Sequence, residues 1–362
     1  MHELRYRISF NTPAFLGNAD QLAQWRTPQI KALLRQWWRV VKARELHEDF
    51  SVAALRQAEA RLFGGGEGTA GAPLPSRLRI RLDGWAQGTL RRWPAEEPRE
   101  FHPEMRRPVG AELYLGYGPL GYDRNSRQAG LSGGRPGHAQ RSAIEDRSCN
   151  RLRLRLPEPA AAEIEAALRL VQWFGTLGAR ARNAWGSLYL EQEEGAALPP
   201  LSAAALAPWL RPLASCLERD WPHAIGTDQR GPLVWLTPER SSWRRVMKDL
   251  ARLKITWRTQ AAPFPNALPG DLGRRHLLSL PVTNHEIRLP GWERNSRLSS
   301  QLRFKLQRTA GGGLRGVIVH LPCRVPALLS DALRGRLPDE LPLWQDVHRV
   351  LDSLEHLARR LD

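Results

Sequence analysis

Two segments of the chain alternate strictly between apolar and polar side chains, and this alternation constrains the fold more than any other feature. They are ELRYRISF, residues 3–10, and CNRLRLRLP, residues 149–157. Successive side chains of a β-strand point to opposite faces of a sheet, so a period of two predicts a strand in each segment. Helical patterns are predicted from Pro28 to about residue 46, from Val52 to Phe63 and over the segment that ends near Phe174.

The order of these elements predicts the fold class. A hairpin is expected around Asp83-Gly84, between residues 76–84 and 88–93, and a further strand is expected over residues 186–194. The first half then reads strand, helix, hairpin, strand, helix, strand, which is typical of a ferredoxin-like or RRM-like sheet with helices on one face. A similar order recurs in the second half. We therefore predict an α+β protein with two tandem ferredoxin-like (RRM-like) domains and antiparallel sheets.

A proline- and alanine-rich stretch at residues 195–208 predicts a domain boundary, with domains at 1–195 and 209–362. Residues 93–143 are rich in proline, glycine and arginine with little periodicity, which predicts a long loop insertion in the first domain. The elements expected in the second domain are strands at 231–237, 276–283, 297–308 and 314–321, a helix from Ser242 to about Trp257, and an amphipathic helix at 343–361.

The charge balance favours a polyanionic partner, because the formal net charge is +17 and the isoelectric point is near 11.0. No apolar run approaches the roughly 18 residues of a membrane span. The three cysteines, Cys149, Cys216 and Cys323, are far apart, so neither zinc nor a disulfide framework is expected and a cytoplasmic location fits. The motifs of P-loop nucleotide hydrolysis and serine hydrolysis are absent from the sequence. We expect no catalytic residue, metal or cofactor.

The helix that begins near Pro28 has two different faces. One is apolar and includes Trp37, which we expect in the core. The second arc, roughly 100° wide, carries Lys31, Arg35, Trp38, Arg39 and Lys42. No acidic residue lies on that arc, so these charges cannot pair with one another by i,i+4 spacing. Basic residues beside an exposed aromatic ring at Trp38 are typical of single-stranded nucleic-acid binding. The alternative is a solvated basic face, with Trp38 packed against a neighbouring element.

A glycine-rich segment, GTLGARARNAWG at residues 175–186, is the second candidate site. Glycine allows a positive φ or a close approach to a ligand, and arginine offers a forked donor to phosphate. In an extended turn Arg180 and Arg182 would point the same way and grip adjacent phosphates. Trp185 either stacks on a base or packs under the loop. The alternative is a helix C-cap followed by a basic turn. The candidate residues are Gly175, Gly178, Arg180, Arg182, Asn183, Trp185 and Gly186.

Taken together, these stretches resemble the RAMP superfamily of CRISPR effector proteins, and within it the two-domain head-end RAMP subunit of the type III-B Cmr complex. Over about residues 6–190 the motifs occur in the family's order. Beyond that, the resemblance rests on RNSRLSSQLRFKL at 294–306 and the hairpin that follows. The motifs are TPAFLGNADQ (12–21), WRTPQIKALLRQWWRVVKARE (25–45), EARLFGG (59–65), YLGYG (114–118) and GTLGARARNAWGSL (175–188).

The resemblance implies a subunit that binds guide RNA (crRNA), caps the RAMP filament near the guide 3′ end and helps to capture target RNA. It implies neighbouring RAMP subunits as partners and no nuclease site of its own. By position, Lys31, Arg35 and Arg39 match the family's basic first helix, and Gly175, Gly178, Arg180, Arg182 and Gly186 match its loop. The loop departs from the family pattern at Thr176, Asn183 and Ala184, where the family usually has a second glycine and small residues. A bulkier loop would approach RNA less closely or serve subunit packing.

Two alternatives remain. Some RAMP proteins process precursor guide RNA without metal, using His, Tyr or Lys as general acid and base. The histidines available for such an endoribonuclease are His2, His47, His102 and His138, and none has a recognisable partner in the sequence. The other alternative, a basic scaffold at a membrane surface or on another polyanion, is disfavoured by the RRM-like order of elements.

Overall fold

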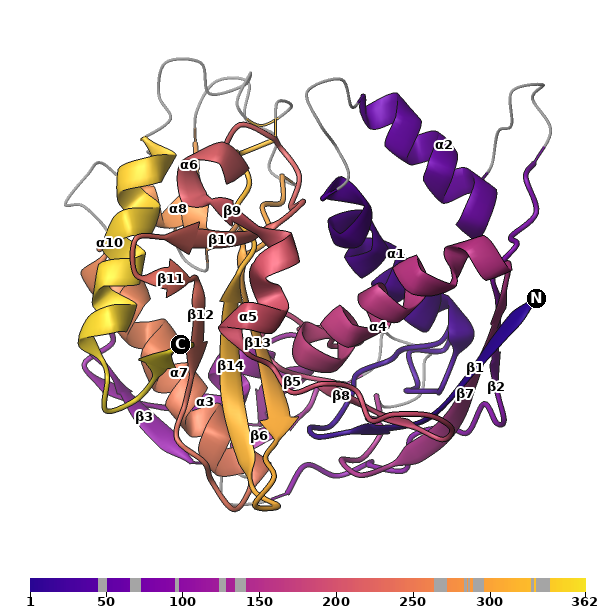
Figure 1. Cartoon of the computed structure of the whole chain (residues 1–362). Helices are drawn as coiled ribbons and strands as arrows, with labels where there is room; N and C mark the ends of the chain where they lie inside the picture. The colour runs from indigo at the N-terminus through magenta and orange to yellow at the C-terminus, as the bar shows by residue number, and fades with distance from the viewer. Residues whose placement is uncertain are drawn as a thin grey trace. The chain divides into compact units, whose positions relative to one another are not determined.

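The computed structural model describes residues 1–44, 51–65, 73–94, 98–123, 128–133, 141–263, 272–282, 285, 287–288, 296–326, 329 and 339–362 (Figure 1). The chain divides into two compact units. Unit 1 comprises Met1–Glu97, Leu115–Leu201 and Lys305–Leu314, and unit 2 comprises Pro98–Tyr114, Ser202–Phe304 and Arg315–Asp362. Residues 98–114, expected in an insertion of the first domain, therefore group with unit 2.

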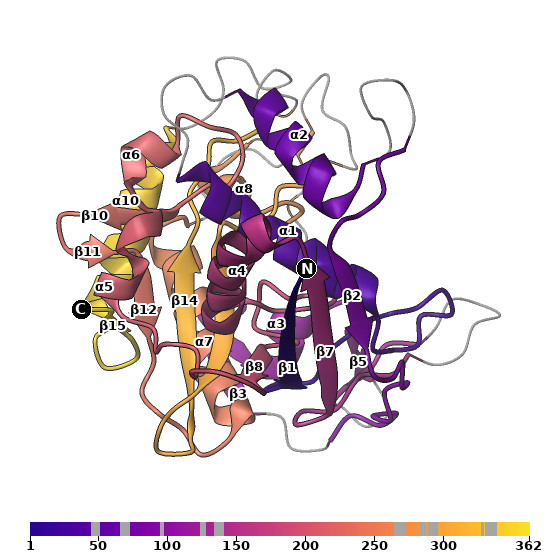
Figure 2. The ribbon, with the colours of Figure 1, turned by 45° about the vertical axis from the view of Figure 1, so that its right-hand side comes forward.

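Unit 1 is built on a four-stranded antiparallel sheet in the order β2-β7-β1-β8, and Figure 2 shows β1, β7 and β2 side by side. In chain order these strands are the first to the fourth, so their order across the sheet is 4-1-3-2, the arrangement of a ferredoxin-like β-α-β-β-α-β unit. The strands are β1 (His2–Phe10), β2 (Arg79–Leu82), β7 (Cys149–Leu156) and β8 (Leu188–Gln192).

Helices cover one face of this sheet. They are α1 (Thr27–Ala43), α2 (Val52–Phe63) and α4 (Ala161–Phe174), which follows the short 3-10 turn η1 (Glu158–Ala160). Figure 1 shows α1 and α4 on the same side of the sheet. The alternate residues Leu4, Tyr6 and Ile8 of β1 are buried. The apolar arc expected on α1 is confirmed, since Trp37 is fully buried and its ring stacks on Phe174 with centroids 5.5 Å apart.

The C-terminal end of α4 is held by side chains of residues 305–314. The Lys305 ammonium is fully buried and donates hydrogen bonds to the carbonyl oxygen of Val171, at 2.8 Å, and to that of Gln172. Gln307 donates to the Trp173 carbonyl oxygen at 3.0 Å. Carbonyls in the last turn of a helix lack partners inside the helix and carry partial negative charge, so a buried cation is tolerated there. Burial lowers the pKa of Lys305 well below its usual range.

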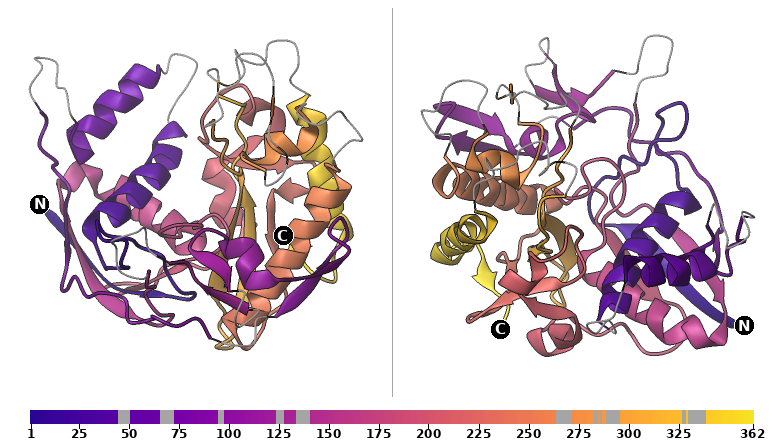
Figure 3. Two further views of the ribbon diagram at one scale, coloured as in Figure 1. Left: turned by 180° about the vertical axis from the view of Figure 1, so that it is seen from behind. Right: turned by 90° about the horizontal axis from the view of Figure 1, so that it is seen from above.

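Unit 2 repeats this arrangement. The second sheet has the order β13-β14-β12-β15, which is again 4-1-3-2 when the strands are numbered along the chain. Its strands belong to unit 2 except for residues 305–308 of β13 and the first residue of β14, which group with unit 1. Figure 3 shows α7 and α10 beside each other on one side of β14. The predicted fold of two ferredoxin-like domains is therefore confirmed. The elements are β12 (Val234–Leu236), α7 (Trp243–Gln260), β13 (Leu302–Arg308), β14 (Leu314–His320), α10 (Glu340–Ser353) and β15 (Arg359–Arg360).

Three expected elements are wrong in detail. The expected hairpin at Asp83-Gly84 does not form, because β2 pairs with β7 and residues 88–93 contribute only an isolated bridge from Leu90. The last helix ends at Ser353, and the two residues of β15 complete the sheet beside β12. Residues 276–278 of the strand expected at 276–283 belong instead to the short helix α8 (Arg274–Leu278). The remaining short elements of unit 2 are α5 (Ala203–Leu206), η2 (Ala207–Trp209), β9 (Leu210–Pro212), α6 (Leu213–Cys216), β10 (Ile225–Asp228), β11 (Gly231–Pro232) and α8 (Arg274–Leu278).

Residues 93–143 were expected to be a loop, and their described parts contradict that expectation. Strands of four residues are too short to reveal a period in the sequence. Inside unit 2, Glu112 is fully buried and accepts hydrogen bonds from Arg244, while Glu104 accepts from Arg275 at 2.6 Å. The elements of this segment are β3 (Arg99–His102), β4 (Arg107–Gly110), α3 (Ala111–Gly116), β5 (Leu120–Asp123) and β6 (Gln128–Leu131).

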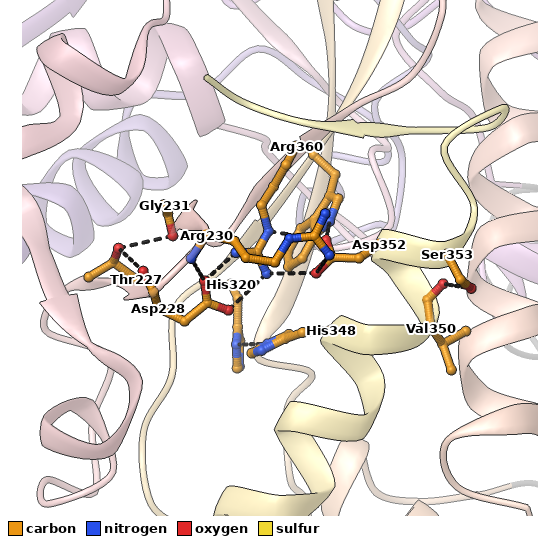
Figure 4. A network of polar contacts seen from close by, with 11 residues as sticks. Thr227, Asp228, Arg230, Gly231, His320, His348, Val350, Asp352, Ser353 and Arg360 are labelled. Carbon is orange, nitrogen blue, oxygen red and sulfur yellow. Dashed lines mark hydrogen bonds and ion pairs between the residues drawn. The ribbon is translucent and has the colours of Figure 1, made fainter.

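A polar network joins β10, β12, α10 and β15 inside unit 2 (Figure 4). The Arg360 guanidinium donates to Asp352, with nitrogen–oxygen distances of 3.1 Å, and to Asp228 at 2.9 Å. Asp352 also accepts a hydrogen bond from the Trp235 indole at 2.8 Å. Arg230 also pairs with Asp352 at 3.1 Å, so two arginines balance the two carboxylates and the network carries no uncompensated charge.

Two buried histidines lie beside this network (Figure 4). His320 Nδ1 and His348 Nε2 are 2.9 Å apart, so one nitrogen donates and the other must be an unprotonated acceptor. Burial lowers the pKa of His348 to about 3, with a smaller contribution from the charge of Arg360. Burial also lowers the pKa of His320 well below its usual range. Burial therefore favours the neutral form of both rings in the folded state.

Unit 2 should lose stability when the pH falls below about 6.5, the ordinary histidine pKa. In that range both rings bind protons in the unfolded chain but not in the folded one, so the unfolding free energy falls by up to about 1.4 kcal/mol per pH unit for each histidine. We expect the midpoint of thermal unfolding to drop between about pH 7 and pH 5, and His348→Gln to flatten this dependence. An equally steep dependence in the variant would contradict the assignment.

Candidate nucleic-acid interface

The basic arc of α1 is paired with acids from other helices. The guanidinium groups of Arg35 and Arg39 converge on the Glu59 carboxylate of α2, with Nε–oxygen distances of 2.7 and 2.6 Å. The Glu59 side chain is only 6% exposed, whereas those of Arg35 and Arg39 are 38% and 44% exposed. Burial opposes ionisation of Glu59, but the hydrogen bonds from Arg39 and Arg35 outweigh it and lower the pKa of the carboxyl.

The expectation of an exposed ring at Trp38 is wrong. Trp38 is 1% exposed, contacts Phe63 edge to face and donates from its indole nitrogen to Glu163 of α4 at 2.8 Å. The same carboxylate accepts a hydrogen bond from Lys42 at 2.7 Å. Helix spacing could not reveal this acid because it belongs to a different helix. Trp38 cannot stack on a base in this arrangement. The RNA-binding roles of Lys42, Arg35 and Arg39 stay predictions.

Lys31 differs from the other cations of the arc. It has no hydrogen bond or carboxylate partner among the residues that the structure describes. Partial burial, and then the charge of Arg35, lower the pKa of its ammonium group. Its RNA-binding role also stays a prediction.

In the glycine-rich segment, the glycines are used for close packing within unit 1. Gly178 has a φ of +97°, and a Cβ placed there would lie 2.6 Å from the carbonyl oxygen of Phe15. Gly186 has a φ of +63°, and its Cβ would lie 2.0 Å from the Leu177 carbonyl oxygen. The Gly186 amide donates to the Pro13 carbonyl at 3.0 Å. No larger residue fits either position unless the backbone moves.

The side chains of this loop also point into unit 1. Arg180 has a φ of +58° and donates from Nε to the Tyr117 carbonyl, and Asn183 donates to the Leu115 carbonyl at 2.8 Å. The extended turn that would align Arg180 with Arg182 is therefore wrong, because Arg180 lies in a tight left-handed turn. The loop and the YLGYG segment, which are about 60 residues apart in the sequence, are therefore in contact.

Trp185 packs under the loop and does not face solvent. It is fully buried, and its ring centroid lies 5.2 Å from that of Phe15 and 5.4 Å from that of Trp93. Gly175 has an ordinary φ of −75° and ends α4, and its amide donates to the Val171 carbonyl at 2.7 Å. The RNA-binding roles of the loop residues stay predictions.

A basic surface that was not predicted from the sequence lies on the outer face of the unit 1 sheet. In β1 and β7 the buried residues alternate with arginines, and β2 continues the pattern. The signal was present in the alternation itself, since arginine fills nearly every polar position of these strands. We call this surface the arginine face, and its members are Arg5, Arg7, Arg79, Arg81, Arg151, Arg153 and Arg155.

Strand register places these arginines directly opposite one another. The opposed pairs across β1, β7 and β2 are Arg5–Arg153, Arg7–Arg151, Arg153–Arg81 and Arg155–Arg79. Some of the charge is compensated: Arg5 pairs with Glu3 and Glu194, Arg151 with Glu193, and Arg153 with Asp83, at 2.8 to 3.3 Å. Arg79, Arg81 and Arg155 have no carboxylate within 4.0 Å in the described part of the chain.

The histidines of the endoribonuclease alternative are not brought together. His2 lies 3.6 Å from Glu158 and 3.4 Å from Glu165 at the surface of unit 1. His102 is buried in unit 2 with its ring centroid 5.9 Å from that of Tyr114, and burial lowers its pKa. His47 and His138 lie outside the described residues. Within the described ranges, no three His, Cys, Asp or Glu side chains are arranged to hold a metal ion, and no helix is long and apolar enough to cross a membrane.

Replacing both Arg35 and Arg39 by alanine should destabilise the protein by roughly 2–3 kcal/mol, because Glu59 is left buried without a partner and the arginines themselves are partly solvated. Adding Glu59→Gln should recover most of this loss, since a neutral amide needs no counter-charge. Urea denaturation of the double and triple variants measures both effects. If the triple variant is no more stable than the double, the ion pair is not what holds α2 to α1.

No family model matches the sequence, and no curated protein matches it. Among solved structures, the chain is similar to Cmr1 from Pyrococcus furiosus in its apo form, with 14% identity, 89% of this chain and 88% of that chain covered, and a TM-score of 0.44. The fold assignment given above rests on the two 4-1-3-2 sheets.

Two further solved structures contain similar chains. One is the type III-B Cmr-beta complex bound to cognate target RNA, with 10% identity, 95% of this chain and 99% of that chain covered, and a TM-score of 0.48. The other is a type IV-B CRISPR complex, with 13% identity, 55% of this chain and 96% of that chain covered, and a TM-score of 0.33. Chains of type III-B CRISPR effector complexes are thus among the solved structures that this chain resembles.

Proposed function

We propose that this chain is a non-catalytic RNA-binding subunit of a type III-B CRISPR antiviral effector complex. In this proposal it binds guide RNA and complementary target RNA, contacts neighbouring RAMP subunits and caps their filament near the guide 3′ end. Target cleavage and second-messenger synthesis then belong to other subunits of the complex.

The observation that carries the proposal is the convergence of the RAMP-like motifs in space. TPAF, LGYG and the glycine loop come from residues 12–15, 115–118 and 175–186, yet they pack against one another within unit 1. The Ala184 carbonyl oxygen accepts a hydrogen bond from the Thr12 hydroxyl at 2.7 Å, which adds a further link between the first and last of these segments. A chance match of three short motifs would not place them in contact, so the convergence supports a shared structural design.

Charge supports the RNA-binding part of the proposal. The net charge of +17 is concentrated in arginine and lysine side chains, of which the chain has 54 against 37 acidic side chains. Phosphate contacts supply affinity without reading sequence, and this suits a subunit that must accept guides of many sequences. A ferredoxin-like sheet with one open face offers such a surface on a rigid element.

The endoribonuclease alternative is favoured only by the neighbourhood of His102. Its ring lies beside Tyr114, and Lys254 lies 5.8 Å from the centre of the Tyr114 ring, so three side chains of general acid–base type are close together in unit 2. Incubation of the purified chain with repeat-containing RNA in EDTA distinguishes a metal-independent endoribonuclease from a non-catalytic RNA-binding subunit. Intact RNA is expected, and discrete products that disappear in His102→Ala would favour the enzyme.

The isolated chain should bind single-stranded RNA with little base preference and a steep salt dependence. Each neutralised phosphate contributes about −0.7 to the slope of log affinity against log salt, so a subunit that contacts several phosphates should lose affinity steeply between low and physiological salt. Fluorescence anisotropy with RNAs of equal length and different sequence measures both properties. Binding that does not change with salt would count against the proposal, and so would a strong preference for one base sequence.

A further inference from the structure

We propose that the arginine face of unit 1, and above all its β2–β7 half, is a binding surface for the sugar-phosphate backbone of single-stranded RNA. This inference rests on the proposed function and adds to it the surface that the RNA contacts. It moves the main RNA contact away from α1 and the glycine loop, whose side chains are engaged in unit 1.

The charges of the sheet are distributed unevenly between its two edges. At the β8 edge, Glu191, Glu193 and Glu194 lie in or just after the strand, and Glu193 and Glu194 pair with Arg151 and Arg5. In the β2–β7 half, Asp83 follows β2 and pairs with Arg153, but Arg79, Arg81 and Arg155 have no carboxylate within 4.0 Å among the described residues, and all three are exposed. A polyanion is therefore attracted to the β2–β7 half and repelled from the β8 edge.

The arrangement is unfavourable for the sheet on its own. Like charges directly opposite on neighbouring strands destabilise a sheet, and Arg153 of β7 faces arginines on both sides, Arg5 and Arg81. Arg155 lies opposite Arg79 on β2, while Glu3 on β1 is opposite its other side. A surface with no partner would be more stable with acidic or neutral residues at some of these positions. An anionic ligand removes the repulsion, because the phosphates lie between the guanidinium groups.

The geometry suits a chain of phosphates. Residues two apart on a strand are roughly 7 Å apart, and neighbouring strands are about 5 Å apart, so the guanidinium groups form a grid of forked donors that phosphates can bridge. Strand positions are rigid, which reduces the entropy lost on binding. An exposed aromatic residue adjoins this half: Trp85, three residues beyond the end of β2, is 51% exposed and offers a ring for base stacking.

The test compares two triple variants of the full chain with equal charge. R79Q/R81Q/R155Q changes the arginine face, and R245Q/R349Q/R359Q changes exposed arginines of unit 2, so each removes three positive charges from the net +17. The probe is a fluorescein-labelled single-stranded RNA of mixed sequence. The sheet variant should bind roughly 10- to 100-fold more weakly, and its log–log salt slope should be smaller by about 2, whereas the control variant should change affinity by less than about threefold.

Two further measurements separate a binding role from a folding role. The sheet variant should unfold at the same temperature as the wild type or higher, because opposed like charges have been removed. Trp85→Ala should weaken binding without changing the salt slope, since stacking releases no counterions. A sheet variant that binds weakly and also unfolds at a lower temperature would overturn the inference, because the loss of binding would then follow from the fold.

The remaining outcomes distinguish this inference from the proposed function. If the wild-type chain does not bind the RNA probe, the proposed function itself fails. If the wild type binds and the two triple variants weaken equally, only bulk charge matters and the arginine face is not the site. If the sheet variant binds RNA as the wild type does but no longer assembles with its partner subunits, the face binds an acidic protein surface, and the RNA assignment is overturned.

Discussion

The close approach of the glycine loop to residues 13–15 is the constraint on which unit 1 depends. Gly178 and Gly186 bring backbone against backbone at distances that no Cβ would permit, and the buried Trp185 fills the space beneath the loop. Thr12 continues the contact through its hydroxyl group, which accepts a hydrogen bond from the Ser187 amide at 3.0 Å. The loop therefore joins the end of β1, a central strand, to the start of β8, the edge strand that pairs with it. A motif that resembles a phosphate cradle has a structural role at these positions.

Pairing with nearby carboxylates decides which of the many basic side chains remain available to bind a polyanion. On α1, Glu59 pairs with both Arg35 and Arg39, and Glu163 pairs with Lys42, so three of the four cations of the basic arc share two carboxylates. On the open face of the sheet, acids from β1, from the end of β2 and from the β8 edge pair with Arg5, Arg151 and Arg153. Arg79, Arg81 and Arg155 have no carboxylate within 4.0 Å in the described ranges.

The sequence alone was enough to predict helices and strands with a clear hydrophobic period. It was not enough to predict which strands pair when they are far apart in the chain. The alternation of residues 3–10 and 149–157 located β1 and β7 closely, and α2 runs from Val52 to Phe63 as expected. The partner of β2 was missed because β7 lies about seventy residues further along the chain, and the two residues of β15 are too few to show a pattern. Among the residues of the predicted helix, helical spacing placed Trp37 correctly in the core. It misplaced Trp38 because its partner, Glu163, lies on another helix.

We propose that this chain works as an RNA-binding subunit of a multi-subunit CRISPR effector. The most direct measurement is to purify the tagged full-length chain from the cells that make it, under conditions that preserve complexes, and to sequence the RNA that is retained. If the proposal is correct, the purified chain retains short RNAs that carry CRISPR repeat-derived ends, and other RAMP subunits are purified with it. A chain recovered alone, or with RNA that reflects only the abundance of cellular transcripts, would contradict it.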